Sequence, residues 1–165
     1  MVDPAEHLLD LEQALDWRRR LKEQHLRLVV TNGCFDLLHR GHASYLGAAR
    51  NLGDALLVLI NSDASVRRLK GDGRPIVSEE DRAFMLNSLK AVDRVMIFSG
   101  TDCADELAAI APDIYVKAGD YTLDKLNAAE RAALERVGAE IVFMPFVADR
   151  STTGTIAKIL AAYRK

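Results

Sequence analysis

Short apolar runs alternate along this chain with longer stretches in which apolar residues recur every three or four positions. The short runs predict strands and the longer stretches predict helices. We expect strands at residues 26–30, 55–60, 94–98, 114–116 and 140–144, and helices at 41–52, 63–70, 78–90, 102–110, 123–137 and 153–163. This alternation predicts a doubly wound, Rossmann-like α/β fold, with a five-stranded parallel sheet and helices on both faces.

The first 25 residues show a different pattern. Charged residues surround Leu8, Leu11, Leu15 and Leu21, and this pattern predicts one amphipathic helix over 4–24, with Pro4 near its first turn. We expect residues 1–25 to form this helix and residues 26–165 to form the main domain. The helix is expected to pack against that domain or against a partner subunit, as in a homodimer.

The segment from Gly33 to His42, directly after the first predicted strand, carries the clearest chemical signal. Gly33 permits a tight turn or a close approach to a ligand, and Gly41 lets a helix begin with its N–H groups open to an anion. His39 and His42 are three residues apart, so both side chains fall on one helix face and can donate hydrogen bonds to the same polyphosphate. The segment therefore predicts a phosphate-binding site for a nucleoside triphosphate.

Each of these residues also has a structural interpretation. A glycine after a strand is usually part of a turn, and a single histidine is more often a surface or core residue than a functional one. A zinc site is the competing chemical interpretation, but the metalloprotease pattern requires histidines four residues apart with an adjacent glutamate. Because this segment has neither that spacing nor a nearby third ligand, the combination favours phosphate binding.

The pattern Gly33-x-Phe35-Asp36-x-x-His39-x-Gly41-His42 resembles the signature of the HxGH nucleotidyltransferase superfamily, in its cytidylyltransferase-like branch. Within this branch, the motifs are most similar to those of adenylyltransferases that act on D-glycero-D-manno-heptose 1-phosphate. The likeness covers about residues 26–160 and continues in Asn61-Ser62-Asp63, Arg67-x-x-Lys70-Gly71, Gly73-Arg74-Pro75, Arg82, Lys117-Ala118-Gly119-Asp120-Tyr121 and Ser151-Thr152-Thr153. Ala118 replaces a glycine that is common in the family, and Cys34 replaces a small apolar residue.

The resemblance implies transfer of AMP from ATP to a sugar 1-phosphate with release of pyrophosphate, which yields ADP-heptose for a surface glycan. A separate heptose kinase would act in the same pathway. Mg²⁺ would be held mainly by the ATP phosphates, without a protein ligand. The attacking phosphate is already an anion, so the reaction needs positioning and charge stabilisation rather than a protein nucleophile.

The resemblance also assigns roles to individual residues. It assigns catalysis to His39, His42 and Lys70. Besides these three, it assigns nucleotide binding to Thr31, Asn32, Gly33, Phe35, Gly119, Asp120, Tyr121, Ser151, Thr152 and Thr153. It assigns acceptor binding to Asp36, Asn61, Asp63, Arg74 and Arg82. Structural interpretations stay open for many of these residues, because hydroxyls commonly cap helices and a lysine on a surface loop is commonly solvated.

Other functions use the same phosphate site. Cytidylyltransferases for glycerol phosphate or a phosphonate and FMN adenylyltransferases differ from a heptose 1-phosphate enzyme only in their base and acceptor pockets. A nucleotide-sensing module is the alternative outside enzymes. The histidine pair together with Lys70 favours an enzyme, because a sensor has less need of charge placed on a leaving group.

Composition narrows the list of partners and compartments. The 165 residues are 49% hydrophobic and 28% charged, as in a single globular domain, and the net charge is −2. This charge gives no general attraction for nucleic acid or an anionic membrane, so neither is an expected partner. Cys34 and Cys103 lack paired spacing, and the sequence has neither a leader pattern nor an apolar run long enough to span a membrane. We therefore expect a protein of the reducing cytoplasm.

Overall fold

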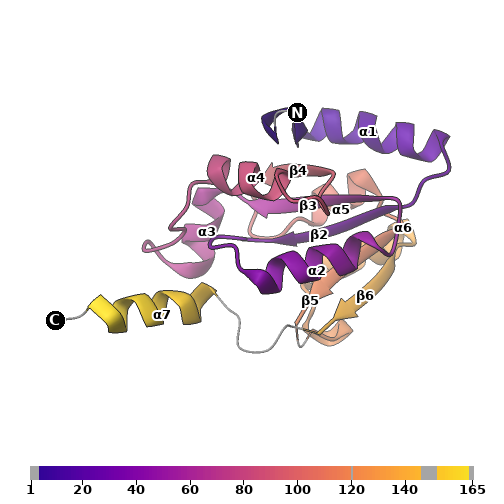
Figure 1. Cartoon of the computed structure of the whole chain (residues 1–165). Coiled ribbons are helices and arrows are strands. Elements are labelled where there is room, and N and C mark those ends of the chain that lie inside the picture. Colours follow the sequence, from indigo (N-terminus) through magenta and orange to yellow (C-terminus); the bar gives the residue numbers. More distant parts are fainter. Residues whose placement is uncertain (1–3, 120, 146–151, 164–165) are drawn as a thin grey trace.

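A six-stranded sheet forms the centre of the computed structural model, which describes residues 4–119, 121–145 and 152–163. The strand order is β1-β4-β3-β2-β5-β6, and every neighbouring pair is parallel. The strands are β1 (Leu8–Leu9), β2 (Leu28–Gly33), β3 (Ala55–Asn61), β4 (Arg94–Phe98), β5 (Ile114–Ala118) and β6 (Glu140–Met144). The predicted doubly wound fold is confirmed, with six strands in place of the expected five (Figure 1).

The additional strand corrects the prediction of a single helix over residues 4–24. The described residues begin with a short 3-10 helix, Pro4–His7, and β1 then pairs with β4 at the edge of the sheet. Helix α1 (Leu11–Glu23) begins only after Asp10. Asp10 Oδ1 accepts a hydrogen bond from the Gln13 N–H at 2.8 Å, and Gln13 Oε1 accepts one from the Asp10 N–H at 2.9 Å. This capping box fixes the helix start.

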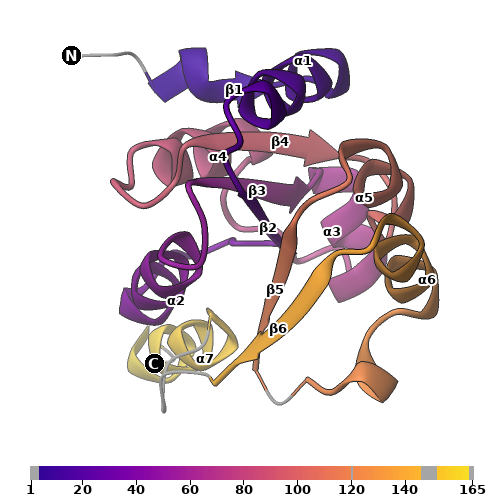
Figure 2. The ribbon, with the colours of Figure 1, turned by 90° about the vertical axis from the view of Figure 1, so that its right-hand side faces the viewer.

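Helices cover both faces of the sheet, and each face has its own apolar core (Figure 2). Helices α1, α5 (Ala104–Ile110) and α6 (Ala128–Val137) cover one face, and α2 (Arg40–Arg50) and α4 (Glu79–Asn87) cover the other. In β2, Val30 belongs to the first core and Val29 to the second. Burial on both faces explains why the strands are continuous apolar runs.

The remaining helices are α3 (Asp63–Lys70), α7 (Thr152–Tyr163) and the short 3-10 helix Leu123–Lys125. The helix predicted over 123–137 is therefore divided in two. Asn127 accepts hydrogen bonds from the N–H groups of Ala129 and Glu130, and this cap starts α6. None of the described helices is long and apolar enough to cross a membrane.

Candidate functional site

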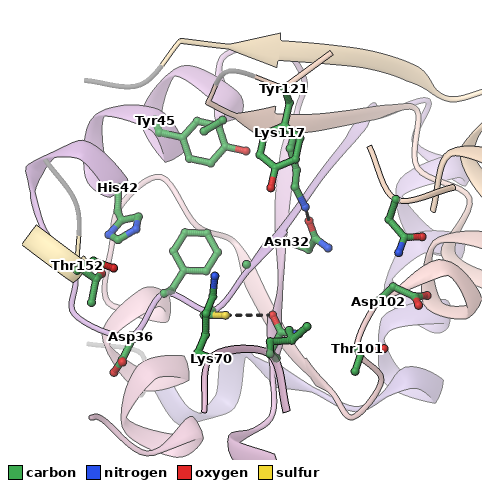
Figure 3. A pocket seen from close by; sticks show the side chains of 18 of the residues that line it. Asn32, Asp36, His42, Tyr45, Lys70, Thr101, Asp102, Lys117, Tyr121 and Thr152 are labelled. Carbon is green, nitrogen blue, oxygen red and sulfur yellow. Dashed lines mark hydrogen bonds between the residues drawn. The ribbon is translucent and has the colours of Figure 1, made fainter. Parts of the chain in front are cut away.

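An open cavity of about 600 Å³ lies where β2, β3 and β5 end (Figure 3). Ligands of doubly wound sheets bind at this edge. Among the predicted site residues, the cavity is lined by Asn32, Gly33, Phe35, Asp36, His39, His42, Asn61, Lys70, Arg74, Tyr121, Thr152 and Thr153. Thr31, Asp63, Arg82 and Gly119 do not line it. The predicted residues Asp120 and Ser151 lie outside the described residues.

Several lining residues had no predicted role. The ones with longer polar side chains are Tyr45, Thr101, Asp102, Lys117, Lys125, Asn127 and Glu130. Lys117 belongs to a segment that carries the family resemblance, and this signal was sufficient to nominate it. The others lie in stretches without a motif, and the fold alone brings them to the cavity.

The two histidines lie at the start of α2. His39 is the N-cap residue of this helix, and His42 lies in its first turn. Their imidazole rings stack, with centroids 3.9 Å apart and planes inclined by 19°. Both line the cavity beside the first N–H groups of the helix, which can bind an anion. The pair thus forms a donor surface for phosphate oxygens.

His42 is neutral near pH 7. Burial and the adjacent His39 ring lower the pKa of His42 to about 4. Its Nδ1 atom is buried and has no hydrogen-bond partner among the described residues. A neutral imidazole retains one N–H to donate, and a bound anion would favour the protonated form and raise this pKa.

Gly33 allows the ring of Phe35 to lie against the end of β2. A Cβ atom at position 33 would lie 3.0 Å from Cε2 of Phe35, so a larger residue would displace the ring. Phe35 has a φ of 47°, a conformation that is uncommon for bulky residues. Its ring is buried and lies 5.2 Å from the His42 ring, between centroids. The turn therefore provides an apolar support for His42.

The N-terminus of α7 contributes to the same side of the cavity. Thr152 Oγ1 donates a hydrogen bond to the Leu37 carbonyl at 3.3 Å, which ties α7 to the loop that precedes the histidines. Thr152 and Thr153 both line the cavity. Two helix N-termini, those of α2 and α7, therefore open onto it, and each carries a partial positive charge.

Lys70 reaches the cavity from the end of α3. It is the last residue of this helix, and its side chain points into the cavity (Figure 3). Gly71 follows with a φ of 90°, a conformation that favours glycine. The lysine is exposed, so its ammonium group can change position when a ligand binds.

Asp36 anchors residues 74–77, the later part of the loop that follows Lys70. Its buried carboxylate accepts hydrogen bonds from Arg74 Nε at 2.5 Å and from the N–H groups of Ile76 and Val77 at 2.9 and 3.0 Å. Burial acts to raise the pKa of Asp36, but these hydrogen bonds outweigh it and lower the pKa below its usual value. The carboxylate predicted to face the acceptor thus also anchors this loop.

Arg82 joins three parts of the site although it is almost completely buried, with 1% exposure. It donates to the Cys34 carbonyl at 2.6 Å, to the Val77 carbonyl at 3.0 Å and to Asp63 Oδ1 at 2.7 Å. These acceptors lie in the turn after β2, at the end of the Lys70 loop and at the start of α3. Arg82 therefore joins the start of α3 to the end of the loop after it, and Lys70 lies between these two points in the chain.

Asn61 lines the cavity directly, whereas Thr31 contributes to it through a neighbouring side chain. Asn61 donates to Ser65 Oγ at 2.9 Å and accepts from Cys34 Sγ at 3.6 Å. Thr31 is fully buried, and its Oγ1 lies 2.5 Å from the hydroxyl of Tyr45. Because the Tyr45 hydroxyl donates to a backbone carbonyl, Thr31 is the donor of this pair and fixes Tyr45 at the cavity wall.

A buried polar network lies between β2, β5 and α6. Glu130, 3% exposed, accepts hydrogen bonds from Asn32 Nδ2 at 2.8 Å and from the Tyr115 hydroxyl at 3.3 Å. Asn32 Oδ1 in turn accepts from Lys117 Nζ at 2.5 Å, and this ammonium lies 3.8 Å from the Glu130 carboxylate. The network holds a positive charge at the cavity wall, since both Lys117 and Asn32 line the cavity.

Among the described residues, no group of three or more histidine, cysteine, aspartate or glutamate side chains is placed to hold a metal ion. The donors at the cavity are instead imidazoles, ammonium groups, hydroxyls and helix N–H groups. Such a set suits a ligand that carries its own cation on phosphate oxygens.

Comparisons with known proteins agree with this geometry. Residues 30–156 match the family model described as cytidylyltransferase-like. The chain is 46% identical over 142 residues to the bifunctional protein HldE of Geobacter sulfurreducens, 45% over 154 residues to that of Mesorhizobium japonicum and 48% over 152 residues to that of Helicobacter pylori. These matches cover 86%, 93% and 92% of this chain but only 29%, 31% and 31% of the relatives. The chain thus spans less than a third of their length.

A solved structure is also similar. It is the lipopolysaccharide core biosynthesis protein from Thermoplasma volcanium, which is 29% identical, with a TM-score of 0.59 over 74% of this chain and 97% of that chain. The chain belongs to the cytidylyltransferase-like family and is a nucleotidyltransferase.

Proposed function

We propose that the protein transfers AMP from MgATP to a sugar 1-phosphate, D-glycero-D-manno-heptose 1-phosphate, and releases pyrophosphate. The observation that carries this proposal is the stacked His39–His42 pair, which faces Lys70 across a cavity onto which two helix N-termini open. These groups can surround a triphosphate with hydrogen-bond donors and positive charge.

The reaction begins with the acceptor phosphate. One of its oxygens attacks the α-phosphorus of ATP and forms a new P–O bond. The bond between the α-phosphorus and the oxygen that bridges to the β-phosphate breaks, and pyrophosphate leaves with the electron pair. Because the attacking oxygen is already an anion, no side chain has to remove a proton from it.

The histidines and Lys70 act on the charge that develops on the leaving pyrophosphate. His39 and His42 donate hydrogen bonds to the phosphates from a fixed helix end, and the α2 N–H groups add to their effect. Lys70 adds a point charge when its loop closes over the triphosphate. Mg²⁺ bound to the ATP phosphates would neutralise part of their charge.

The choice of donor and acceptor rests on similarity. The motif set resembles that of heptose 1-phosphate adenylyltransferases, and the three relatives described above are bifunctional HldE proteins. The similar Thermoplasma volcanium structure is described as a lipopolysaccharide core biosynthesis protein, which agrees with a sugar substrate. A kinase that supplies the sugar phosphate would be the partner enzyme, whether separate or joined to the same chain.

A substrate panel tests the proposal. Pyrophosphate release is measured with MgATP or MgCTP as donor and with heptose 1-phosphate, glycerol 3-phosphate or FMN as acceptor. We expect the highest kcat/KM for MgATP with heptose 1-phosphate. A preference for MgCTP with glycerol 3-phosphate, or for FMN, would reassign the enzyme within the family. Nucleotide binding without turnover of any acceptor would support a sensor instead.

A further inference from the structure

The cavity has two chemically different ends. His42 and Thr152 lie at one end, whereas Thr101 and Asp102, in the connection between β4 and α5, lie at the other (Figure 3). The first end offers imidazole, hydroxyl and helix N–H donors. The Asp36 carboxylate also lies at the first end, but it is already bound in an ion pair and by backbone N–H groups. The second end adds the Asp102 carboxylate, which repels phosphate oxygens. This end therefore suits an uncharged part of a ligand.

The Asp102 carboxylate is only partly used by the protein. Its Oδ1 accepts a hydrogen bond from the Ala104 N–H at 3.2 Å, and within the described residues Oδ2 has no protein donor. The start of α5 adds further negative charge in Asp105 and Glu106. Burial raises the pKa of Glu106, and the Asp105 and Asp102 carboxylates add smaller contributions.

Lys117 separates the two ends. Its ammonium is held by Asn32 at 2.5 Å and lies in the middle of the cavity wall (Figure 3). The buried carboxylate of Glu130 lies 3.8 Å from this ammonium group and helps to hold it in place. A phosphate beside Lys117 would leave the rest of its molecule free to extend toward Asp102.

We propose that Thr101 and Asp102 form a hydroxyl-binding subsite for the sugar ring of the acceptor, whose phosphate lies beside Lys117. A carboxylate oxygen and a threonine hydroxyl are suited to neighbouring sugar hydroxyls, which donate to the first and can donate to or accept from the second. The subsite thus selects polyhydroxylated acceptors over short or aromatic ones. This inference rests on the proposed function, since it specifies how that site recognises its acceptor.

Ribose carries the same chemistry, so the test must distinguish the two substrates. We would compare Asp102→Asn and Thr101→Val with the wild type in MgATP-dependent pyrophosphate release from heptose 1-phosphate. Asp102→Asn keeps an oxygen for the Ala104 N–H, and thermal unfolding checks that both variants fold. Asp105→Asn is the matched control, because it removes the same charge from an exposed position that does not line the cavity.

We expect the KM for heptose 1-phosphate to rise about tenfold in Asp102→Asn, because a hydrogen bond from a sugar hydroxyl to a charged group is lost. The KM for MgATP should change less than twofold, and Asp105→Asn should resemble the wild type. An unchanged acceptor KM, or an equal rise in the ATP KM, would overturn the inference while leaving the proposed function intact. Absence of wild-type turnover with every sugar phosphate would overturn both.

Discussion

The imidazole rings of His39 and His42 lie stacked at the start of α2, with centroids 3.9 Å apart. Burial raises the free energy of charging the His42 ring, and a charge on the neighbouring His39 ring adds to this effect. The pKa of His42 is accordingly lowered to about 4. In the free protein the His42 ring is thus an uncharged hydrogen-bond donor. A bound polyphosphate would favour its protonated, charged form.

Nucleotide binding should therefore take up protons. His42 is uncharged in the free protein down to about pH 4, whereas a bound triphosphate favours the charged ring and raises its pKa. Uptake should be largest between about pH 4.5 and 6.5 and vanish near pH 8. Calorimetry of MgATP binding in two buffers of different ionisation enthalpy measures it. His42→Asn should bind with less uptake, and identical uptake in the two proteins would contradict this expectation.

Asp36→Asn should loosen the loop that follows Lys70. The buried carboxylate accepts bonds from Arg74 and two backbone N–H groups, and its loss should lower the free energy of unfolding by about 1–3 kcal/mol. Because the pKa of Asp36 is lowered in the folded state, this stabilisation is present above the unfolded pKa of about 3.9 and is lost as the pH falls through the folded value.

Urea unfolding at pH 7 and near pH 3 measures this effect. The difference in free energy of unfolding between the wild type and Asp36→Asn should be full at pH 7 and smaller near pH 3. A difference that does not depend on pH would mean that the Asp36 charge has no part in anchoring the loop.

Arg82→Lys should destabilise the protein even though the positive charge is kept. A lysine cannot reach the Cys34 and Val77 carbonyls and Asp63 together, so buried acceptors lose their donors. We expect a loss of about 3 kcal/mol in the free energy of unfolding, measured in urea. Arg19→Lys, in an exposed ion pair, should change it by less than about 0.5 kcal/mol. Equal effects of the two substitutions would argue against the joining role of Arg82.

Lys70→Met should reduce catalysis without reducing stability. The side chain is exposed but points into the cavity, so its loss removes charge from the triphosphate and little packing. We expect kcat for pyrophosphate release to fall about a hundredfold. Arg67→Met, an exposed change on the same helix that does not line the cavity, provides the control for charge alone. If both variants lose the same activity, Lys70 acts only through the general field of the helix.

Local signals in the sequence were sufficient for much of the fold. The strands Arg94–Phe98 and Glu140–Met144 and the helix Asp63–Lys70 begin and end at the predicted residues. Ser62 accepts a hydrogen bond from the Ser65 N–H and Gly71 follows the last helical residue, so the residues that bound this helix lie directly beside its ends. The same holds for the histidine segment, because its glycines and imidazoles lie within ten consecutive residues.

Pairings between distant residues could not be predicted. The two-residue strand β1 exists because Leu8 and Leu9 pair with β4, more than eighty positions away. The contact of Asn32 with Glu130 spans 98 positions, and neither residue carries a local signal for it. The family resemblance assigned Arg82 to binding of the acceptor substrate. In the structure Arg82 is buried, and it donates hydrogen bonds to three groups of the protein itself. Such contacts depend on how the strands and helices are arranged in space. The spacing of apolar residues along the sequence carries no information about this arrangement.

The most direct measurement is the kcat of pyrophosphate release in His39→Asn and His42→Asn, with MgATP and heptose 1-phosphate saturating. Each variant should lose about a hundredfold to a thousandfold in kcat while its thermal unfolding stays close to that of the wild type. His25→Asn is the control, because this exposed residue does not line the cavity and asparagine accepts its φ of 58°. Folded histidine variants that keep kcat within threefold of the wild type would contradict the role of the imidazole pair.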